Sequence, residues 1–401
     1  MSNYPVAAIM AGATAACLAA TLLASWIGRT KFPLPSADTR IGCIDGLRGY
    51  LALSVLIHHF VVWMQATSLG GAWAVPSVNL FAQLGAGGVA LFFMVTGLVF
   101  YPRILAGFRA TAWPAVYTMR VFRIVPLVAV SVAIITLLIA ARTGRGLDAQ
   151  FPAAAAQWIT TWGEPPLLGF ADSGRINAYV LWSLRYEWLF YLAVLPACAL
   201  AMDLVRGRLP SWTVPVALLA IGLLGREAGL PTALLRFLPL FAIGMLAYEV
   251  RSREAIARHL RTRPAAAVAV LALALGMVTA RTPYGSALPL FALFFVCVAC
   301  GNALFGVLRT RGALVLGECS FGIYLLHGVV LSVAFVDAGA ERLAPEIVPA
   351  LLPLAAVAVT MVTPLTFLIV ERPALRLGAL LARRMSAGAA ARLRLDAAPS
   401  A

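Results

Sequence analysis

The sequence is poor in charged residues, which make up only 12% of its 401 positions, while 62% are hydrophobic. Soluble domains carry about 25% charged and roughly 45–50% apolar residues. Because so little charge cannot cover a water-exposed surface, a soluble enzyme is excluded and lipid is the expected solvent. The formal net charge is +15, but the basic residues stand in short clusters between apolar runs, which is typical of topology signals. We therefore expect a lipid bilayer as a partner, and no nucleic acid.

Cysteine is also scarce, since only six are present and all lie in or beside apolar stretches. Cys297 and Cys300 form a C-x-x-C within FFVCVACG, but no second pair and no histidine cluster accompanies them. A metal site would need such additional ligands. We interpret the cysteines as packing residues and expect no metal. The sequence also lacks a Walker motif and an internal repeat, and we expect no appended soluble domain.

What is abundant is apolar sequence in runs of membrane-spanning length, which is about 20 residues. The eleven candidate spans lie at 6–27, 44–66, 80–101, 122–141, 179–202, 212–225, 231–250, 265–280, 287–306, 314–336 and 349–370, of which 212–225 and 265–280 are short. This pattern predicts an all-α polytopic membrane protein. We expect an extra N-terminal transmembrane helix and cytoplasmic linker over 1–40, a ten-helix core over 41–375 and a cytoplasmic tail over 376–401.

The distribution of basic residues predicts the orientation. The first five residues, MSNYP, contain no Lys or Arg, whereas a cleavable signal peptide begins with positive charge. The first helix is therefore expected to be retained, with the N-terminus outside. Alternate loops hold most of the Lys and Arg, which places these loops and the C-terminus in the cytoplasm of an inner (plasma) membrane protein. The longest external loop, 142–178, is expected to be a connecting loop with Trp anchors, and the alternative is that it lies in the interface or covers an external cavity.

The first core helix, IDGLRGYLALSVLIHHFVVW, carries an arginine and a histidine eleven residues apart. At ~100° and ~1.5 Å per residue, Arg48 and His59 share one face within about 20° and lie ~16.5 Å apart along the axis. His58 points about 80° away from Arg48. Ionisable groups in lipid are expensive and are therefore functional candidates.

Two further residues reach a similar depth. Glu187 is expected ~12 Å below the outer edge of a core ~30 Å thick, and His327 ~20 Å above the inner edge. Together with His59 they fall in the outer half of the membrane and could meet in one cavity. A carboxylate that orients an imidazole is the arrangement of general-base catalysis. The alternative is that these are buried polar groups that tie helices together.

A second set is expected at the cytoplasmic face: Arg48, Thr96, Arg120 and Arg123, the last two in MRVFRIVP. Three guanidinium groups near one surface suit a phosphorylated ligand through bidentate contacts. The alternative for Arg120 and Arg123 is a topology signal. Arg48 is less readily explained as a topology signal, because it lies inside an apolar run.

The same segments resemble, in order, the motifs of the acyltransferase 3 family. They are IDGLRGYLALSVLIHHF, with an Arg and a His eleven positions on; LFFMVTGLVF, for F-F-x-x-S-G-F/Y; MRVFRIVP, for R-x-x-R-x-x-P; LWSLRYEWLFY, for W-S-L-x-x-E-x-x-F-Y; LGECSFGIYLLH, for G-x-x-S-F/Y-x-x-Y-L-x-H; and the closing ERP, for E-x-P. The resemblance runs from about 41 to 375. It departs at Thr96, where Ser is usual, at Arg185, an added cation, and in the helix that precedes the family's usual ten.

The resemblance implies an enzyme that moves an acyl group, usually acetyl, from cytoplasmic acyl-CoA to a hydroxyl of an extracytoplasmic acceptor, often a glycan. It implies acetyl-CoA as a donor co-substrate and no bound cofactor. His59 would be catalytic, as general base or transient acyl carrier, and Glu187 would assist it. The donor would bind to Arg48, Thr96, Arg120 and Arg123. The substrate cavity would be lined by Trp182, Tyr191, Ser320, Tyr324 and His327, while Glu371 would be structural and pair with a cytoplasmic Arg.

Two other functions compete with this one. A transporter or flippase for a lipid-linked or anionic solute also buries ionisable groups, but it usually shows inverted repeats and broken helices, and the sequence shows neither. A structural subunit would not need His59 together with Glu187. The identity of the acceptor, the acyl chain length and the oligomeric state stay open.

Overall fold

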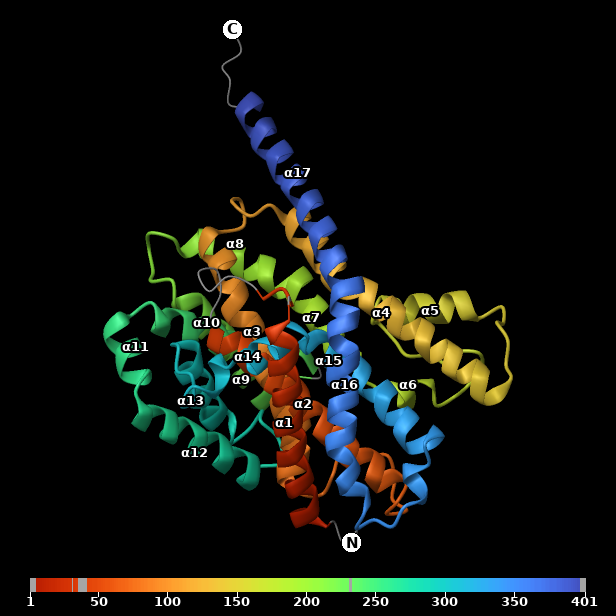
Figure 1. The fold of residues 1–401 in the computed structure, drawn as a ribbon. Coiled ribbons are helices and arrows are strands. Elements are labelled where there is room, and N and C mark those ends of the chain that lie inside the picture. The colour runs from red at the N-terminus through yellow and green to blue at the C-terminus, as the bar shows by residue number, and fades with distance from the viewer. Residues whose placement is uncertain (1–4, 31, 35–41, 231–232, 397–401) are drawn as a thin grey trace.

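The computed structural model describes residues 5–30, 32–34, 42–230 and 233–396, and helices account for the fold (Figure 1). No strand occurs in these ranges apart from an isolated bridge between Leu167 and Phe170. Lys31, Arg40 and most of the linker expected before residue 41 lie outside the described residues, as does the end of the expected tail.

The helices follow one another along the chain. They are α1 (Val6–Arg29), α2 (Gly42–Ala66), α3 (Asn79–Ala106), α4 (Trp113–Thr143), α5 (Phe151–Ile159), α6 (Ser173–Ile176), α7 (Trp182–Leu189), α8 (Leu195–Val205), α9 (Thr213–Glu227), α10 (Leu238–Arg251), α11 (Glu254–Leu260), α12 (Arg263–Thr279), α13 (Leu288–Ala299), α14 (Arg311–Glu318), α15 (Ser320–Ser332), α16 (Leu352–Thr366) and α17 (Arg372–Asp396). π-Helical turns occur at η2 (Phe190–Val194), η5 (Val333–Asp337) and η8 (Phe367–Glu371), and 3-10 turns at η3 (Ala233–Arg236), η4 (Val307–Arg309), η6 (Ala340–Arg342) and η7 (Val348–Leu351).

The protein is a multi-pass membrane protein. In the described part of the chain, eight helical segments are long and apolar enough to cross a bilayer, or nine if α11 and α12, bent by 72°, form one span. The expected eleven spans are therefore too many by this measure. α9 and α13 have 15 and 12 residues, or ~22 and ~18 Å of a core ~30 Å thick. α13 stops because Gly301 adopts φ +104, although the apolar run continues.

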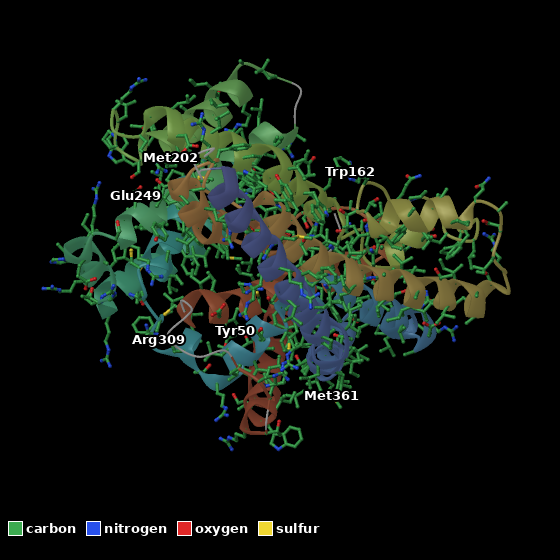
Figure 2. All side chains as sticks on the ribbon, turned by 90° about the horizontal axis from the view of Figure 1, so that it is seen from above. Tyr50, Trp162, Met202, Glu249, Arg309 and Met361 are labelled. Atoms are coloured by element: carbon green, nitrogen blue, oxygen red, sulfur yellow. The ribbon has the colours of Figure 1, made fainter. Side chains whose placement is uncertain are left out.

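The central helices are α2 and α3, whose spans are the most buried. α2 packs against α3, α14 and α15, and α3 packs against α10. α1 lies on the outside against α14 and α16 (Figure 1), and exposes Leu18, Leu22 and Trp26 as expected for a lipid-facing surface. α4 and α5 extend to one side of this bundle (Figures 1 and 2).

Two close crossings of glycines set the positions of the central helices. A Cβ on Gly317 of α14 would lie within 2.0 Å of the carbonyl oxygen of Asp45 in α2, and one on Gly244 of α10 would lie 2.0 Å from that of Met94 in α3. Small residues let helix backbones approach closely in membrane proteins. These crossings hold Arg48 and Thr96, which stand beside them in sequence, at fixed positions in the bundle.

The loop between α4 and α7 is folded and contains the short helices α5 and α6. Its Glu164 accepts a hydrogen bond from the backbone N–H of Leu181 at 3.2 Å and so ties the loop to the start of α7. Burial raises the pKa of Glu164 to about 7, although that hydrogen bond and the charge of Arg185 act in the opposite direction. The loop is therefore attached through a carboxyl group that titrates near neutral pH.

We predict that Gly244→Ala lowers the melting temperature of the detergent-solubilised protein. The new methyl group would meet backbone that cannot yield, and overpacking of this kind costs about 1–3 kcal/mol. Gly285→Ala is the control, because nothing lies within 4 Å of its Cβ position. Equal melting temperatures for both variants would contradict the close crossing.

We further predict that Glu164→Gln stabilises the protein increasingly as the pH rises. Burial raises the pKa of Glu164 in the folded protein. The contribution of its protonated carboxyl to the free energy of unfolding is therefore complete below the pKa of the unfolded chain, and it is lost as the pH rises through about 7. The amide stays neutral and keeps an oxygen for Leu181. Melting temperatures of both proteins from pH 4 to 8 test this, and a constant difference over that range argues against a buried carboxyl.

Candidate active site

A cavity of about 720 Å³ opens between α2, α3, α4, α7, α10 and α15. Its wall contains four arginines, Arg48, Arg120, Arg123 and Arg251, and three acidic residues, Asp45, Glu187 and Glu318. A volume of this size is typical of small-molecule sites (~300–1,000 Å³). The arginines come from three separate helices, so the fold gathers cationic groups that are far apart in the sequence.

Two of these arginines are paired with carboxylates. Arg48 lies 3.7 Å from Asp45, one helical turn earlier. Arg123 donates from Nη1 to Glu371 Oε2 at 3.3 Å, and Glu371 is buried. The expected pairing of Glu371 with an arginine is therefore confirmed, and its partner is Arg123. Pairing lowers the charge that Arg123 can offer to a ligand.

Arg120 and Arg251 are less completely satisfied. The guanidinium of Arg120 lies over the rings of Phe100 and Tyr191, 5.0 and 5.6 Å from their centroids. Its Nε, and Nη1 of Arg251, are buried without a hydrogen-bond partner among the described atoms. Sequence reasoning missed Arg251, because it ends α10 beside other arginines and was counted as a topology signal. Unsatisfied guanidinium nitrogens are costly, which favours an anionic ligand here.

Glu187 faces the same cavity and is held by hydroxyl groups. Thr96 Oγ1 donates to Glu187 Oε1 at 3.2 Å, and Tyr191 donates to the same oxygen at 3.1 Å. The π-helical turn η2 begins three residues after Glu187, at Phe190, and contains Tyr191. Because a π turn shifts the face of a helix, and such turns often occur at functional sites, this irregularity helps to direct both side chains into the cavity.

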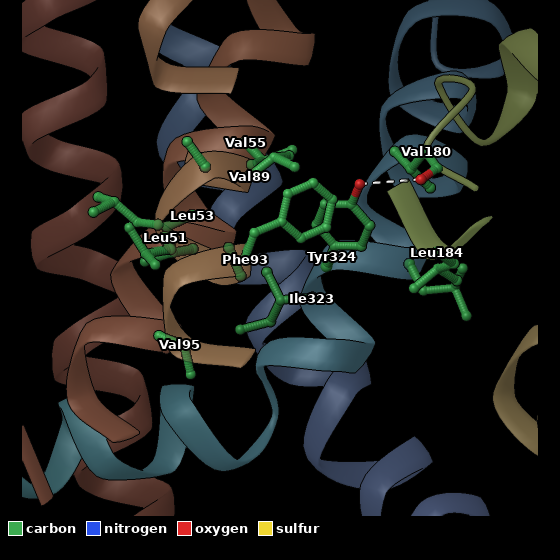
Figure 3. Close-up of a cluster of buried hydrophobic side chains, with 14 of the residues drawn as sticks. Leu51, Leu53, Val55, Val89, Phe93, Val95, Val180, Leu184, Ile323 and Tyr324 are labelled. Carbon is green, nitrogen blue, oxygen red and sulfur yellow. Dashed lines mark hydrogen bonds between the residues drawn. The ribbon is translucent and has the colours of Figure 1, made fainter. Parts of the chain in front are cut away.

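Tyr324 stands at the end of the cavity towards His327. Its hydroxyl donates to the carbonyl oxygen of Val180 at 3.0 Å, as Figure 3 shows, and Ser183 Oγ lies 2.7 Å from the same hydroxyl. The ring centroid of Tyr324 lies 6.2 Å from that of His327. Tyr324 therefore lines the cavity and also lies next to a histidine that is outside the cavity wall. Ser320 also lines the cavity, and its buried hydroxyl has no partner among the described atoms.

Beyond Tyr324, histidines of α2 and α15 meet. His327 Nε2 lies 2.9 Å from His59 Nδ1, and their rings stack with centroids 5.0 Å apart. The expectation that His59 and His327 could meet is therefore confirmed, while their depth in the membrane stays a prediction. His58 Nδ1 faces the carbonyl oxygen of Phe81 at 2.7 Å, so it ties α2 to α3. His59 is half-buried and His327 is fully buried.

The structure thus divides the predicted residues differently from the sequence analysis. Arg48, Thr96, Arg120, Arg123, Glu187, Tyr191, Ser320 and Tyr324 line the cavity. His59 and His327 lie beyond it. Trp182 also lies outside and packs against Tyr186 and Phe237 while 40% exposed. Axial depth placed Glu187 with the histidines, but depth does not determine which neighbour a side chain faces, and Glu187 faces Thr96 and Tyr191 instead.

The described residues contain no group of three or more His, Cys, Asp or Glu side chains arranged to hold a metal ion. Their cysteines are unpaired, and all but Cys17 are buried. The site therefore consists of a cavity with arginines in its wall and, next to Tyr324, a pair of imidazoles.

Comparison with known proteins assigns the family. The acyltransferase 3 family model, described as an acyltransferase domain, matches residues 41–370, which is most of the chain. No curated protein and no solved structure gives a significant match. The matched range contains every residue named above as lining the cavity, together with both paired histidines, whereas Glu371 lies one residue beyond it. The chain belongs to the acyltransferase 3 family and is a membrane acyltransferase.

Proposed function

We propose that this protein transfers an acyl group, in the simplest case acetyl, from cytoplasmic acyl-CoA to a hydroxyl group of an extracytoplasmic carbohydrate. The membrane is the inner (plasma) membrane, with the N-terminus outside and the C-terminus in the cytoplasm, as the distribution of Lys and Arg predicts. The acyl-CoA is consumed as a co-substrate.

The observation that carries the proposal is the cavity wall with four arginines that begins at Arg48 on α2, the helix that also carries His59. The phosphates of CoA are anionic, and guanidinium groups bind phosphate through charge-assisted hydrogen bonds. Arg120 and Arg251 are the principal donors in this proposal, because Arg123 is already paired with Glu371. Glu187 supports the cavity by holding Thr96 and Tyr191.

The histidine pair supplies the reaction step. The arm of CoA extends along α2 over the ~16.5 Å between Arg48 and His59, and the Tyr324 ring moves aside to admit the thioester. The acceptor hydroxyl oxygen attacks the thioester carbonyl carbon while His59 takes the hydroxyl proton. The C–S bond then breaks, the new ester remains on the acceptor, and the CoA thiolate receives the proton. A transient acyl-His59 intermediate is the other route to the same products.

We predict that His59→Ala abolishes ester formation, because general acid–base groups contribute about 10²–10⁴-fold. The measurement is acetate released by mild alkali from the cell envelope of a deletion strain that carries each variant, since mild alkali cleaves esters and leaves amides. His259→Ala is the matched control, because His259 is exposed. Wild-type ester levels with His59→Ala, at equal protein abundance, would refute the assignment.

We also predict that Arg120→Ala and Arg251→Ala each weaken CoA binding by about 10–100-fold, since a hydrogen bond to a charged group is worth about 1.5–3 kcal/mol. Titration calorimetry of the purified protein measures this. Arg208→Ala, at an exposed arginine, should bind as the wild type does. Pantetheine, which lacks the nucleotide phosphates, should bind all four proteins equally. An unchanged CoA affinity in both cavity variants would place the phosphates elsewhere.

A further inference from the structure

We propose that His327 is a positioning residue that holds His59 as the tautomer protonated on Nδ1, so that His59 Nε2 is the basic atom of the site. The inference rests on the proposed function in one respect, because it takes His59 as the group that reacts. The tautomer itself follows from hydrogen-bond geometry and can be measured without any activity.

The tautomer of His327 is set by a backbone contact. Its Nδ1 lies 3.0 Å from the carbonyl oxygen of Ile323, one turn earlier in α15. A carbonyl oxygen only accepts, so this Nδ1 carries a hydrogen. In a neutral imidazole the other nitrogen then has no hydrogen and accepts. His327 Nε2 is therefore an acceptor, and it points at His59.

The tautomer of His59 follows from the two acceptors that face its Nδ1. Its Nδ1 lies 2.9 Å from His327 Nε2 and 3.1 Å from the carbonyl oxygen of Val55. Both neighbours are acceptors, so a hydrogen on His59 Nδ1 satisfies both contacts. The opposite tautomer would place three lone pairs against one another at hydrogen-bond distance. The remaining nitrogen, Nε2, is therefore without a hydrogen and free to take one.

The surroundings fix the arrangement in place. His327 and the ring of His58 are buried, and the His58 and His59 rings meet edge to face with centroids 4.8 Å apart. His58 Nδ1 is itself directed at the carbonyl oxygen of Phe81. In each of the three rings, Nδ1 thus faces a backbone carbonyl oxygen. This repeated arrangement selects the same tautomer for every ring in the cluster.

His327 takes the position beside the base His59 that a carboxylate takes in hydrolase triads. In hydrolase triads a carboxylate holds the histidine in the reactive tautomer and also stabilises its charged form. Here a neutral imidazole supplies the orientation. When the acceptor hydroxyl transfers its proton to His59 Nε2, the hydrogen on Nδ1 stays between His59 and His327. The resulting His59 imidazolium then donates a hydrogen bond to the neutral His327 ring, which carries no opposite charge to stabilise it.

Nitrogen NMR tests the tautomer directly. The chain has four histidines, so ¹⁵N-histidine labelling of the protein in nanodiscs gives few signals. Single variants His58→Gln, His259→Gln and His327→Gln assign them. In neutral rings we expect a pyrrole-type signal for His59 Nδ1 and a pyridine-type signal for His59 Nε2. A pyridine-type Nδ1 in His59 would overturn the proposal, whether or not the protein is active.

Kinetics test the role of His327. Inside-out membrane vesicles with labelled acetyl-CoA report alkali-labile product at saturating and subsaturating donor. We expect His327→Leu to lower the maximal rate by on the order of 10²-fold, with an unchanged apparent KM for acetyl-CoA, because a misplaced tautomer impairs the chemical step. His327→Gln keeps an acceptor oxygen and should recover most of the rate. His259→Leu is the control.

The outcomes separate the two proposals. Equal losses in His327→Gln and His327→Leu, or a loss confined to KM, would overturn the positioning role while His59 stays the base. A wild-type rate with His327→Leu would do the same. Full activity with His59→Ala would instead refute the proposed function, and the NMR result would then describe a structural histidine pair.

Discussion

The structure depends on one constraint: a polar group buried in a lipid-embedded bundle needs a partner from the protein or from a bound ligand, because the hydrocarbon offers none. Glu371 meets Arg123, Glu187 meets two hydroxyl groups, and His59 meets His327. The contacts of Glu371 with Arg123, of Glu187 with Thr96 and of His59 with His327 each join helical segments that lie far apart in sequence. The contact of Glu187 with Tyr191 joins successive turns on one wall of the cavity. The same contacts that satisfy the polar groups therefore also position them, so stability and the geometry of the site have a common origin.

α2 connects the two parts of the site. Its Arg48 end lines the cationic cavity, and its His59 end carries the imidazole pair. The glycine crossing with α14 fixes the first end, and the contact with α15 fixes the second. Tyr324 of α15 lies between them and is itself held by Val180 and Ser183. In the proposed reaction this tyrosine separates the donor compartment from the reacting groups until the thioester arrives.

The sequence predicts the fold class, the family and much of the site, because these depend on composition, spacing and ordered motifs. The placement of Arg48 and His59 on one helix, the meeting of His59 and His327, and the pairing of Glu371 with an arginine are examples. It could not predict that α13 ends at a left-handed Gly301, which is a backbone property. Nor could it show that Glu187 faces Thr96, or that Arg251 reaches the cavity, since both depend on how distant helices pack.

The most direct test of the account is a structure of the protein with a CoA analogue whose thioester sulfur is replaced by carbon, so that transfer cannot occur. We expect phosphates against Arg120 and Arg251, a displaced Tyr324 ring, and His59 Nε2 facing the acyl end. An acceptor oxygen between them would lie ~3–3.5 Å from the acyl carbon, the separation of a near-attack geometry. An analogue that binds with its acyl end away from α2, with Tyr324 in place, would contradict the account.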